Sequence, residues 1–205
     1  YPSGLADRLA VPVINMGVAG GGLDVVLNDA AIAEACRSAT AIVLQVQGAQ
    51  NLSNRLYTVH PRRNDRFVSA SVMLRTIYRD VDFTEFHFTR HMLDHLRTLS
   101  PDRFAIVRHE LRVAWLSRMK RFLSDAMVPV HLLWLSCRAP QRGESRDGLG
   151  EEPLFITTDL LEEVVPQAAS LSVVAVPNAT EKPVKGPMAA EAAAARILPG
   201  TEAHA

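Results

Sequence analysis

Short apolar runs alternate with longer amphipathic segments along most of the chain. The short runs show little polar alternation, which is typical of strands that are covered on both faces. The longer segments repeat apolar residues at spacings of three and four, which predicts helices. The pattern therefore predicts four buried strands separated by helices, and these strands cover residues 9–17, 40–48, 128–136 and 171–177.

The clearest helix start is Ser100-Pro101-Asp102, which combines a capping hydroxyl, a proline in the first turn and an acid near the positive end of the helix dipole. This helix should run to about Ala126. Its expected buried stripe is Phe104, Val107, Leu111, Trp115, Met119 and Phe122. Further helices are expected over residues 3–9, 23–38, 158–168 and 188–198, from Asn64 or Asp65 to about Arg79, and from Asp82 or Thr84 to about Leu99.

Helical connections between strands are crossovers, so the sheet should be mostly parallel. The sequence therefore predicts one α/β domain over residues 1–205, with a doubly wound sheet in three layers of the flavodoxin type. A polar, Gly- and Pro-rich surface loop is expected over residues 139–153. Ligands of such sheets bind beyond the carboxyl ends of the strands, which makes the segments after each strand the candidate site.

The stretch 15-NMGVAGGG-22 follows the first expected strand and is rich in glycine. Its spacing does not fit the dinucleotide-binding fingerprint, and it lacks the Gly-Lys-Ser/Thr of a P-loop. Backbone N–H groups at the start of the next helix could bind an anion. The alternative is a tight turn that needs a positive φ angle.

Asn15, Gly17 and Gly20, placed after a strand, resemble the second conserved block of the SGNH or GDSL-type hydrolases. This resemblance implies that the N–H of Gly17 or Gly20 donates to an oxyanion. The third block of that family ends a strand with Gly-x-Asn-Asp, and this chain has Gly-Ala-Gln50-Asn51 after its second expected strand. Either amide would complete the oxyanion hole, and Asn51 is slightly favoured.

The remaining two blocks of the SGNH family match poorly. The last block, Asp-x-x-His, carries the general base, and the candidate here is His204 with Thr201 at the Asp position. The block with the nucleophilic serine is absent, because Ser3 lies on an expected helix rather than after a strand. We therefore expect an N-terminally truncated domain whose sheet lacks its first strand and whose nucleophile lies outside this chain.

A second resemblance covers most of the chain. The segments GAQNLSNRLYTVHPRRNDRF and VDFTEFHFTRHML are similar to parts of an uncharacterised bacterial domain-of-unknown-function family. The resemblance implies a preceding strand with a Gly-Ser turn in full-length members. It implies no activity, because none is established for that family.

The expected substrate-binding residues are Asn15, Asn54, His60, Arg62 and Arg63, which lie on the predicted cleft side. Arginine forks suit carboxylate, sulfate or phosphate groups, and the alternative is a solvated loop that caps the next helix. Three functions remain open. They are SGNH-like hydrolysis of an ester or acetyl group, non-catalytic binding of an anion or small ligand, and acyl or sulfuryl transfer in polysaccharide metabolism.

The amino-acid composition limits the kinds of partner that we expect this chain to bind. The chain has 22 basic and 22 acidic residues, so no charge excess favours nucleic acid. It has no long apolar run and no signal peptide, so we expect a cytoplasmic protein that does not enter a membrane. The expected partner is a small-molecule or carbohydrate ester, and the sequence does not indicate an oligomeric state.

No cofactor or metal is expected. The two cysteines make neither a disulfide framework nor a zinc site, and Cys137 has no identifiable base. His87, His91 and His95 recur every four residues, a spacing that could bind a metal on a helix. A partly exposed polar stripe is the favoured interpretation of these histidines.

Overall fold

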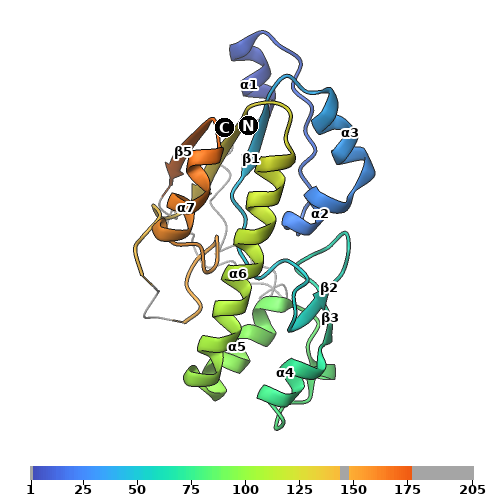
Figure 1. Ribbon diagram of the computed structural model, residues 1–205, viewed down its shortest axis with the longest axis vertical. Helices are drawn as coiled ribbons and strands as arrows, with labels where there is room; N and C mark the ends of the chain where they lie inside the picture. The colour runs from blue at the N-terminus through green and yellow to red at the C-terminus, as the bar shows by residue number, and fades with distance from the viewer. Residues whose placement is uncertain (1, 144–147, 177–205) are drawn as a thin grey trace, which may run out of the picture.

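The computed structural model describes residues 2–143 and 148–176 (Figure 1). A three-stranded sheet has the order β1–β4–β5 with both pairings parallel, and a separate antiparallel hairpin pairs β2 with β3. The predicted mixed α/β arrangement with a mostly parallel sheet is therefore confirmed. The strands are β1 (Ile42–Gln45), β2 (Tyr57–Val59), β3 (Phe67–Ala70), β4 (Val130–Ser136) and β5 (Ser170–Ala175).

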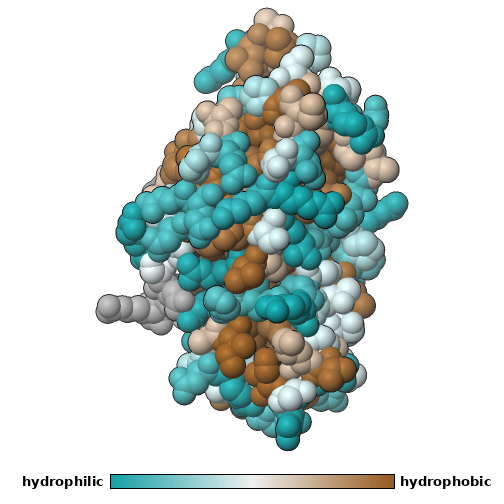
Figure 2. All heavy atoms as spheres, in the orientation of Figure 1, coloured by the Kyte–Doolittle hydropathy of each residue, from teal (hydrophilic) through white to brown (hydrophobic). Residues whose placement is uncertain are grey.

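Helices fill both connections of the parallel sheet, and α6 and α7 lie in front of it in Figure 1. A band of hydrophilic residues crosses the middle of this face, with apolar residues above and below it (Figure 2). None of the helices in the described ranges is long and apolar enough to cross a bilayer. The helices are α1 (Pro2–Leu9), α2 (Leu23–Asn28), α3 (Ala30–Ser38), α4 (Val72–Ile77), η1 (Phe83–Glu85), α5 (Thr89–Leu99), α6 (Pro101–Asp125), α7 (Thr158–Val164) and η2 (Val165–Gln167).

The long helix α6 forms as the sequence predicts. The Ser100 side chain accepts a hydrogen bond from Arg103 N at 3.4 Å, and Pro101 occupies the first turn. All six residues of the predicted stripe are buried. Within this stripe, the Trp115 indole donates to Gln47 O at 2.9 Å, which ties α6 to the end of β1. The apolar stripe is buried because α6 lies in front of the parallel sheet and packs against α2, α5 and α7 (Figure 1).

One edge of β1 is open in the described part of the chain. Ile42 N–H donates to Pro129 O and Val46 N–H donates to Leu133 O, so alternate residues face β4. The intervening residue Val43 directs its backbone groups away from β4, since successive N–H groups of a strand point to opposite sides. Its side chain is 44% exposed.

The predicted strand over residues 9–17 is wrong. This segment pairs with no strand, and Val11 and Ile14 are exposed. Asn15 accepts a hydrogen bond from Gly17 N at 3.0 Å, and this local turn competes with an extended ladder. Pro12 also lacks the N–H that a ladder needs. The sheet therefore contains three of the four expected strands.

Three predicted helices divide, are replaced or begin later than expected. The helix expected over residues 23–38 breaks at Asp29, which has extended φ and ψ angles and accepts hydrogen bonds from the first amides of α3. The helix expected from Asn64 to Arg79 is replaced by β3 and the short α4, which Ser71 caps. The helix expected from Asp82 is only the turn η1, and α5 begins later, at Thr89.

The segments at the end of the chain are partly outside the described residues. The predicted helix over residues 188–198 lies there, as do residues 144–147 of the loop predicted over residues 139–153. The described parts of that loop contain no helix or strand. Its end packs inward, because Leu149 is buried.

Asn64 caps a helix distant in sequence. Its Oδ1 accepts hydrogen bonds from Gly22 N at 2.8 Å and Val25 N at 3.1 Å, the first amides of α2. Its Nδ2 donates to His60 O at 2.9 Å. The side chain is completely buried, so water cannot replace these partners.

We predict that Asn64→Ala lowers the free energy of unfolding by about 1–3 kcal/mol, because it leaves the buried Gly22 amide without an acceptor. Urea denaturation monitored by circular dichroism measures this change. Asn64→Asp is the matched control, since it keeps the acceptor oxygen and should cost less than Asn64→Ala. Equal losses in both variants would contradict the capping role.

Candidate functional site

The glycine stretch forms a tight turn before α2. Gly21 N donates to Val18 O at 2.9 Å, and Gly20 has a φ angle of +69°. This φ at the third residue of a turn is typical of type II turns, which favour glycine there. A Cβ atom on Gly20 would also lie 2.5 Å from Asp65 Oδ1. The turn alternative from the sequence therefore describes the local geometry, and Gly20 is required by conformation and by close packing.

The backbones of Gly22 and Asn51 touch. A Cβ atom on Gly22 would lie 2.0 Å from Asn51 O, a separation that no side chain tolerates. The glycine turn and the loop after β1 therefore lie side by side. These are the two segments that resemble the oxyanion-binding blocks.

The Asn51 side chain has a defined orientation. Its Oδ1 accepts a hydrogen bond from the hydroxyl of Thr89 at 3.0 Å, and Thr89 is buried. Its Nδ2 donates to none of the residues in the described ranges. The Thr89 hydroxyl also lies 3.2 Å from Asp65 O, so its single hydrogen is shared between two acceptors. With the Asn51 Oδ1 facing Thr89, the N–H groups of Asn51 are left without a partner next to the glycine turn. The sequence did not indicate a role for Thr89, because Thr89 lies far from Asn51 along the chain.

Gln50 is placed differently from Asn51. Its Nε2 donates to Glu152 Oε1 at 2.7 Å, and only 2% of the residue is exposed. One of its two N–H groups is therefore bound by Glu152, and burial keeps the other away from solvent. Of the two amides considered for the oxyanion hole, Asn51 is the one with a free donor.

Gly17 and Gly20 also differ in whether their backbone N–H groups are free to bind a ligand. The N–H of Gly17 donates to Asn15 Oδ1, so this N–H is not free for a ligand in this conformation. The N–H of Gly20 makes no hydrogen bond with a described residue, while its carbonyl accepts from Asp65 N at 3.1 Å. Gly20 therefore remains the candidate backbone donor.

The arginine-rich loop is largely self-contained. His60 Nδ1 accepts hydrogen bonds from the backbone amides of Arg62 and Arg63, both at 3.2 Å. The Arg63 guanidinium pairs with Asp65 at 3.0 Å, and this hydrogen bond raises the pKa of Arg63. Asn54 accepts from the amides of residues 56 and 57, which fixes its loop. These contacts support the alternative of a structured polar loop and leave Arg62 as its exposed cation.

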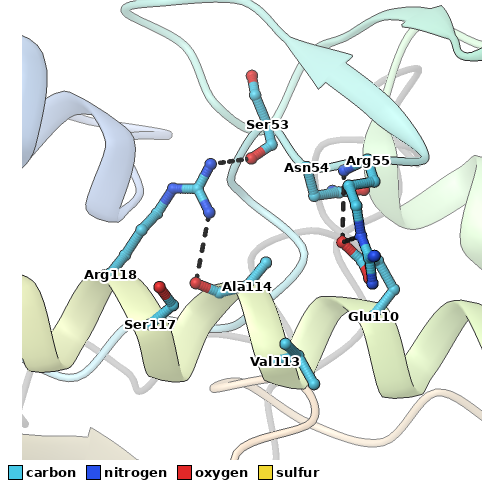
Figure 3. A pocket seen from close by; sticks show the side chains of 8 residues that line it. All are labelled: Ser53, Asn54, Arg55, Glu110, Val113, Ala114, Ser117 and Arg118. Carbon is cyan, nitrogen blue, oxygen red and sulfur yellow. Dashed lines mark hydrogen bonds and ion pairs between the residues drawn. The ribbon is translucent and has the colours of Figure 1, made fainter.

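A groove adjoins the Asn51 loop along α6. It consists of two hollows of about 410 Å³ and 550 Å³ that share Ser53, Ser117 and Arg118. Figure 3 shows the first hollow between the loop after β1 and α6. The second hollow extends to Asp24 and Asn64, next to the glycine turn.

The charges that line this groove are paired. Arg55 binds Glu110 through its guanidinium group, and this hydrogen bond holds the pKa of Glu110 below its usual range. Arg118 Nε donates to the buried Asp24 carboxylate at 2.9 Å. The groove therefore offers hydroxyl and amide groups from Ser53, Ser117, Thr58 and Asn28 without a strong net charge.

The histidines around α5 do not line this groove. His204 lies outside the described residues. His87 precedes α5, and Phe86 packs against the rings of His91 and His95 at 5.2 Å and 5.3 Å. The described ranges contain no group of three or more metal-ligating side chains. Burial raises the pKa of Cys137, which opposes a role as a thiolate nucleophile.

The described residues thus define an α/β protein with a donor-rich loop and a polar groove beside the carboxyl end of β1. The whole chain, residues 1–205, matches the family described as Domain of unknown function (DUF6473), and the chain belongs to this family. No curated protein and no solved structure matches the chain.

We predict that Gly22→Ala destabilises the protein by about 1–3 kcal/mol, the usual cost of forcing extra atoms into a packed site. The new methyl group would overlap the backbone of Asn51, which cannot move as a flexible side chain could. The control is Gly17→Ala, where the nearest atom is the exposed Asn15 side chain at 3.1 Å. Thermal unfolding compares the two variants, and equal melting temperatures would contradict the close contact.

Proposed function

We propose that this domain carries the oxyanion-binding half of an SGNH-like hydrolase site for an ester or acetyl group. The observation that supports it most directly is the free Asn51 amide, held by Thr89 beside the glycine turn. Asn51 Nδ2 and the Gly20 N–H would donate to the tetrahedral oxyanion. Donors placed where charge develops stabilise the transition state of acyl transfer.

The nucleophile in this proposal is a serine on an additional strand beside β1. Its Oγ would attack the ester carbonyl carbon while His204 accepts the serine proton. The bond to the alcohol then breaks, and the alcohol leaves with that proton. Water hydrolyses the acyl-serine and restores the enzyme. Transfer to another acceptor would use the same first half of the reaction.

The additional strand would complete a doubly wound sheet of the SGNH or flavodoxin type. Two observations support it. The edge of β1 away from β4 is open, and the neighbouring residue Val43 is exposed. Every open sheet has two edge strands, but an edge with an exposed apolar residue is a ready template for a further strand.

The groove along α6 would hold the rest of the substrate. It begins at Ser53, two residues after Asn51, and it continues past Asp24. Its paired charges and hydroxyl groups suit an uncharged, polar substrate such as a carbohydrate ester. The anion-binding alternative has less support, because Asp65 already neutralises Arg63.

We predict that the full natural protein hydrolyses 4-nitrophenyl acetate or a peracetylated monosaccharide, and that Asn51→Ala lowers kcat by about 10²–10³-fold, the usual effect of removing one oxyanion donor. Steady-state kinetics measures both. Glu34→Gln, an exposed change on α3, is the control and should leave kcat unchanged. Absence of hydrolysis, or full activity in Asn51→Ala, would refute the proposal.

We further predict that the Val43 and Gln45 amides exchange slowly with solvent in the full natural protein, because the additional strand would accept their hydrogen bonds. Hydrogen exchange followed by NMR measures this. The Val46 amide, which is bonded to β4, is the internal reference for a protected amide of the same region. Fast exchange of Val43 and Gln45 beside a protected Val46 would exclude the strand.

A further inference from the structure

Glu152 places its carboxyl group where several segments meet at the carboxyl end of the sheet. Its Oε1 accepts a hydrogen bond from Gln50 Nε2 at 2.7 Å, and its Oε2 accepts from Leu154 N at 3.1 Å. Its backbone carbonyl accepts from Ser136 Oγ at 2.5 Å. Arg90 of α5 lies 3.5 Å from Oε1. Glu152 therefore connects the loop after β1, the end of β4 and α5.

The side-chain oxygen of Gln50 is a hydrogen-bond acceptor without a donor. Its Oε1 is buried and receives no hydrogen bond from the described residues. A Cβ atom on Gly48 would lie 2.1 Å from this oxygen and 2.7 Å from Glu152 Oε2, so both oxygens lie over the same glycine. The Gln50 oxygen is buried, whereas 21% of the Glu152 side chain is exposed. Two acceptor oxygens that face each other at such a position repel unless a proton lies between them.

We propose that the Glu152 carboxyl group is protonated in the folded protein and forms a cyclic hydrogen-bonded pair with the Gln50 amide. In this pair, Gln50 Nε2 donates to Glu152 Oε1, and the Glu152 Oε2 hydroxyl donates to Gln50 Oε1. The pair gives the Gln50 oxygen a donor and uses one of the two N–H groups of Gln50. Gly48 is required because any side chain would displace one of the two oxygens.

The groups around Glu152 act in opposite directions on its proton. Burial raises the pKa of Glu152 and is the largest effect. The hydrogen bonds from Leu154 N and Gln50 Nε2 lower the pKa, as do the positive charges of Arg90 and Arg138. The net direction is upward, in agreement with the proton that the oxygen contacts require.

The two nearest positive charges are only partly engaged elsewhere. Arg90 Nη1, which lies 3.5 Å from Glu152 Oε1, is buried and makes no hydrogen bond with a described residue, and this charge opposes protonation of Glu152. Arg90 Nη2 donates to Gly150 O at 2.7 Å, and Arg138 Nη2 donates to Glu151 O at 3.3 Å. The carboxylate of Glu151 is exposed and accepts a hydrogen bond from the Cys137 thiol. None of these contacts replaces the missing donor to Gln50 Oε1.

This inference deepens the proposed function, and it rests on that function for any effect on hydrolysis. Asn51 directly follows Gln50, so the acid–amide pair holds the loop that presents the Asn51 donor. Glu152 is therefore a positioning residue that acts through Gln50. Ionisation would remove one of the two hydrogen bonds and place two oxygens in repulsion, so raising the pH would loosen the loop.

The test is a pH titration of the full natural protein, followed by ¹³C NMR of the glutamate carboxyl carbons. The Glu152 signal is assigned by its loss in Glu152→Gln. The expected midpoint lies above the ordinary value of a glutamate side chain. A midpoint at or below that ordinary value overturns the proposal.

The side-chain amide signals of Asn51 provide the second readout. They should shift with the Glu152 midpoint in the wild type and stay constant in Glu152→Gln, whose amide keeps an acceptor for Gln50 and adds a donor. Glu163→Gln, an exposed change on α7, is the matched control and should retain the wild-type shift. A shift that persists in Glu152→Gln overturns the coupling to Asn51.

Stability gives an independent check of the sign. A pKa that is higher in the folded state means that the folded protein binds the proton more tightly. The contribution of Glu152 is therefore complete below its unfolded pKa and is lost as the pH rises through its folded pKa. Glu152→Gln should remove this part of the pH dependence in urea denaturation, and an unchanged dependence contradicts the protonated state.

The outcomes separate this inference from the proposed function. A raised Glu152 midpoint without ester hydrolysis removes the catalytic role of Asn51 and leaves the acid–amide pair intact. Hydrolysis with an ordinary midpoint removes the pair and leaves the hydrolase proposal intact.

Discussion

The rest of the site depends on the hydrogen bonds and the ion pair made by the buried carboxylate of Asp24. It accepts hydrogen bonds from Ser53 N at 2.6 Å and from Arg118 Nε at 2.9 Å, and Arg118 also donates to Ser53 O. These bonds join α2, the loop after β1 and α6. A buried ion pair is tolerated only when its remaining polar atoms are bonded, and this ring of contacts meets that condition. The glycine turn and the groove both take their positions from it.

The sequence predicted the elements whose signals are local. The cap at Ser100 and the apolar stripe of α6 act within one helix, so they could be recognised without knowing the fold. The segment 9–17 shows the opposite case, because an apolar run becomes a strand only when another strand is available to pair with it. The β2–β3 hairpin was missed because its strands are too short to show a pattern.

The sequence was sufficient to predict which two segments form the candidate site. It was not sufficient to predict which of their groups are free hydrogen-bond donors. The glycine stretch and the loop after β1 were expected near each other, and Gly22 and Asn51 do meet. The sequence could not decide between Gln50 and Asn51, since that depends on Glu152 and Thr89, which come from distant parts of the chain. Asn64 was expected to cap the helix that follows it, but it caps α2 instead. A side chain can cap any helix whose first turn lies within hydrogen-bond distance.

The parallel pairing of β1 with β4 has a consequence for how the chain folds. Ile42 lies opposite Val130, and the hairpin, α4, α5 and α6 all lie between them in sequence. Closing so long a loop costs conformational entropy before any sheet contact is gained. The β2–β3 hairpin and the α5–α6 pair involve near neighbours and can form first. We therefore expect the parallel sheet to assemble late, on a helical surface that is already in place.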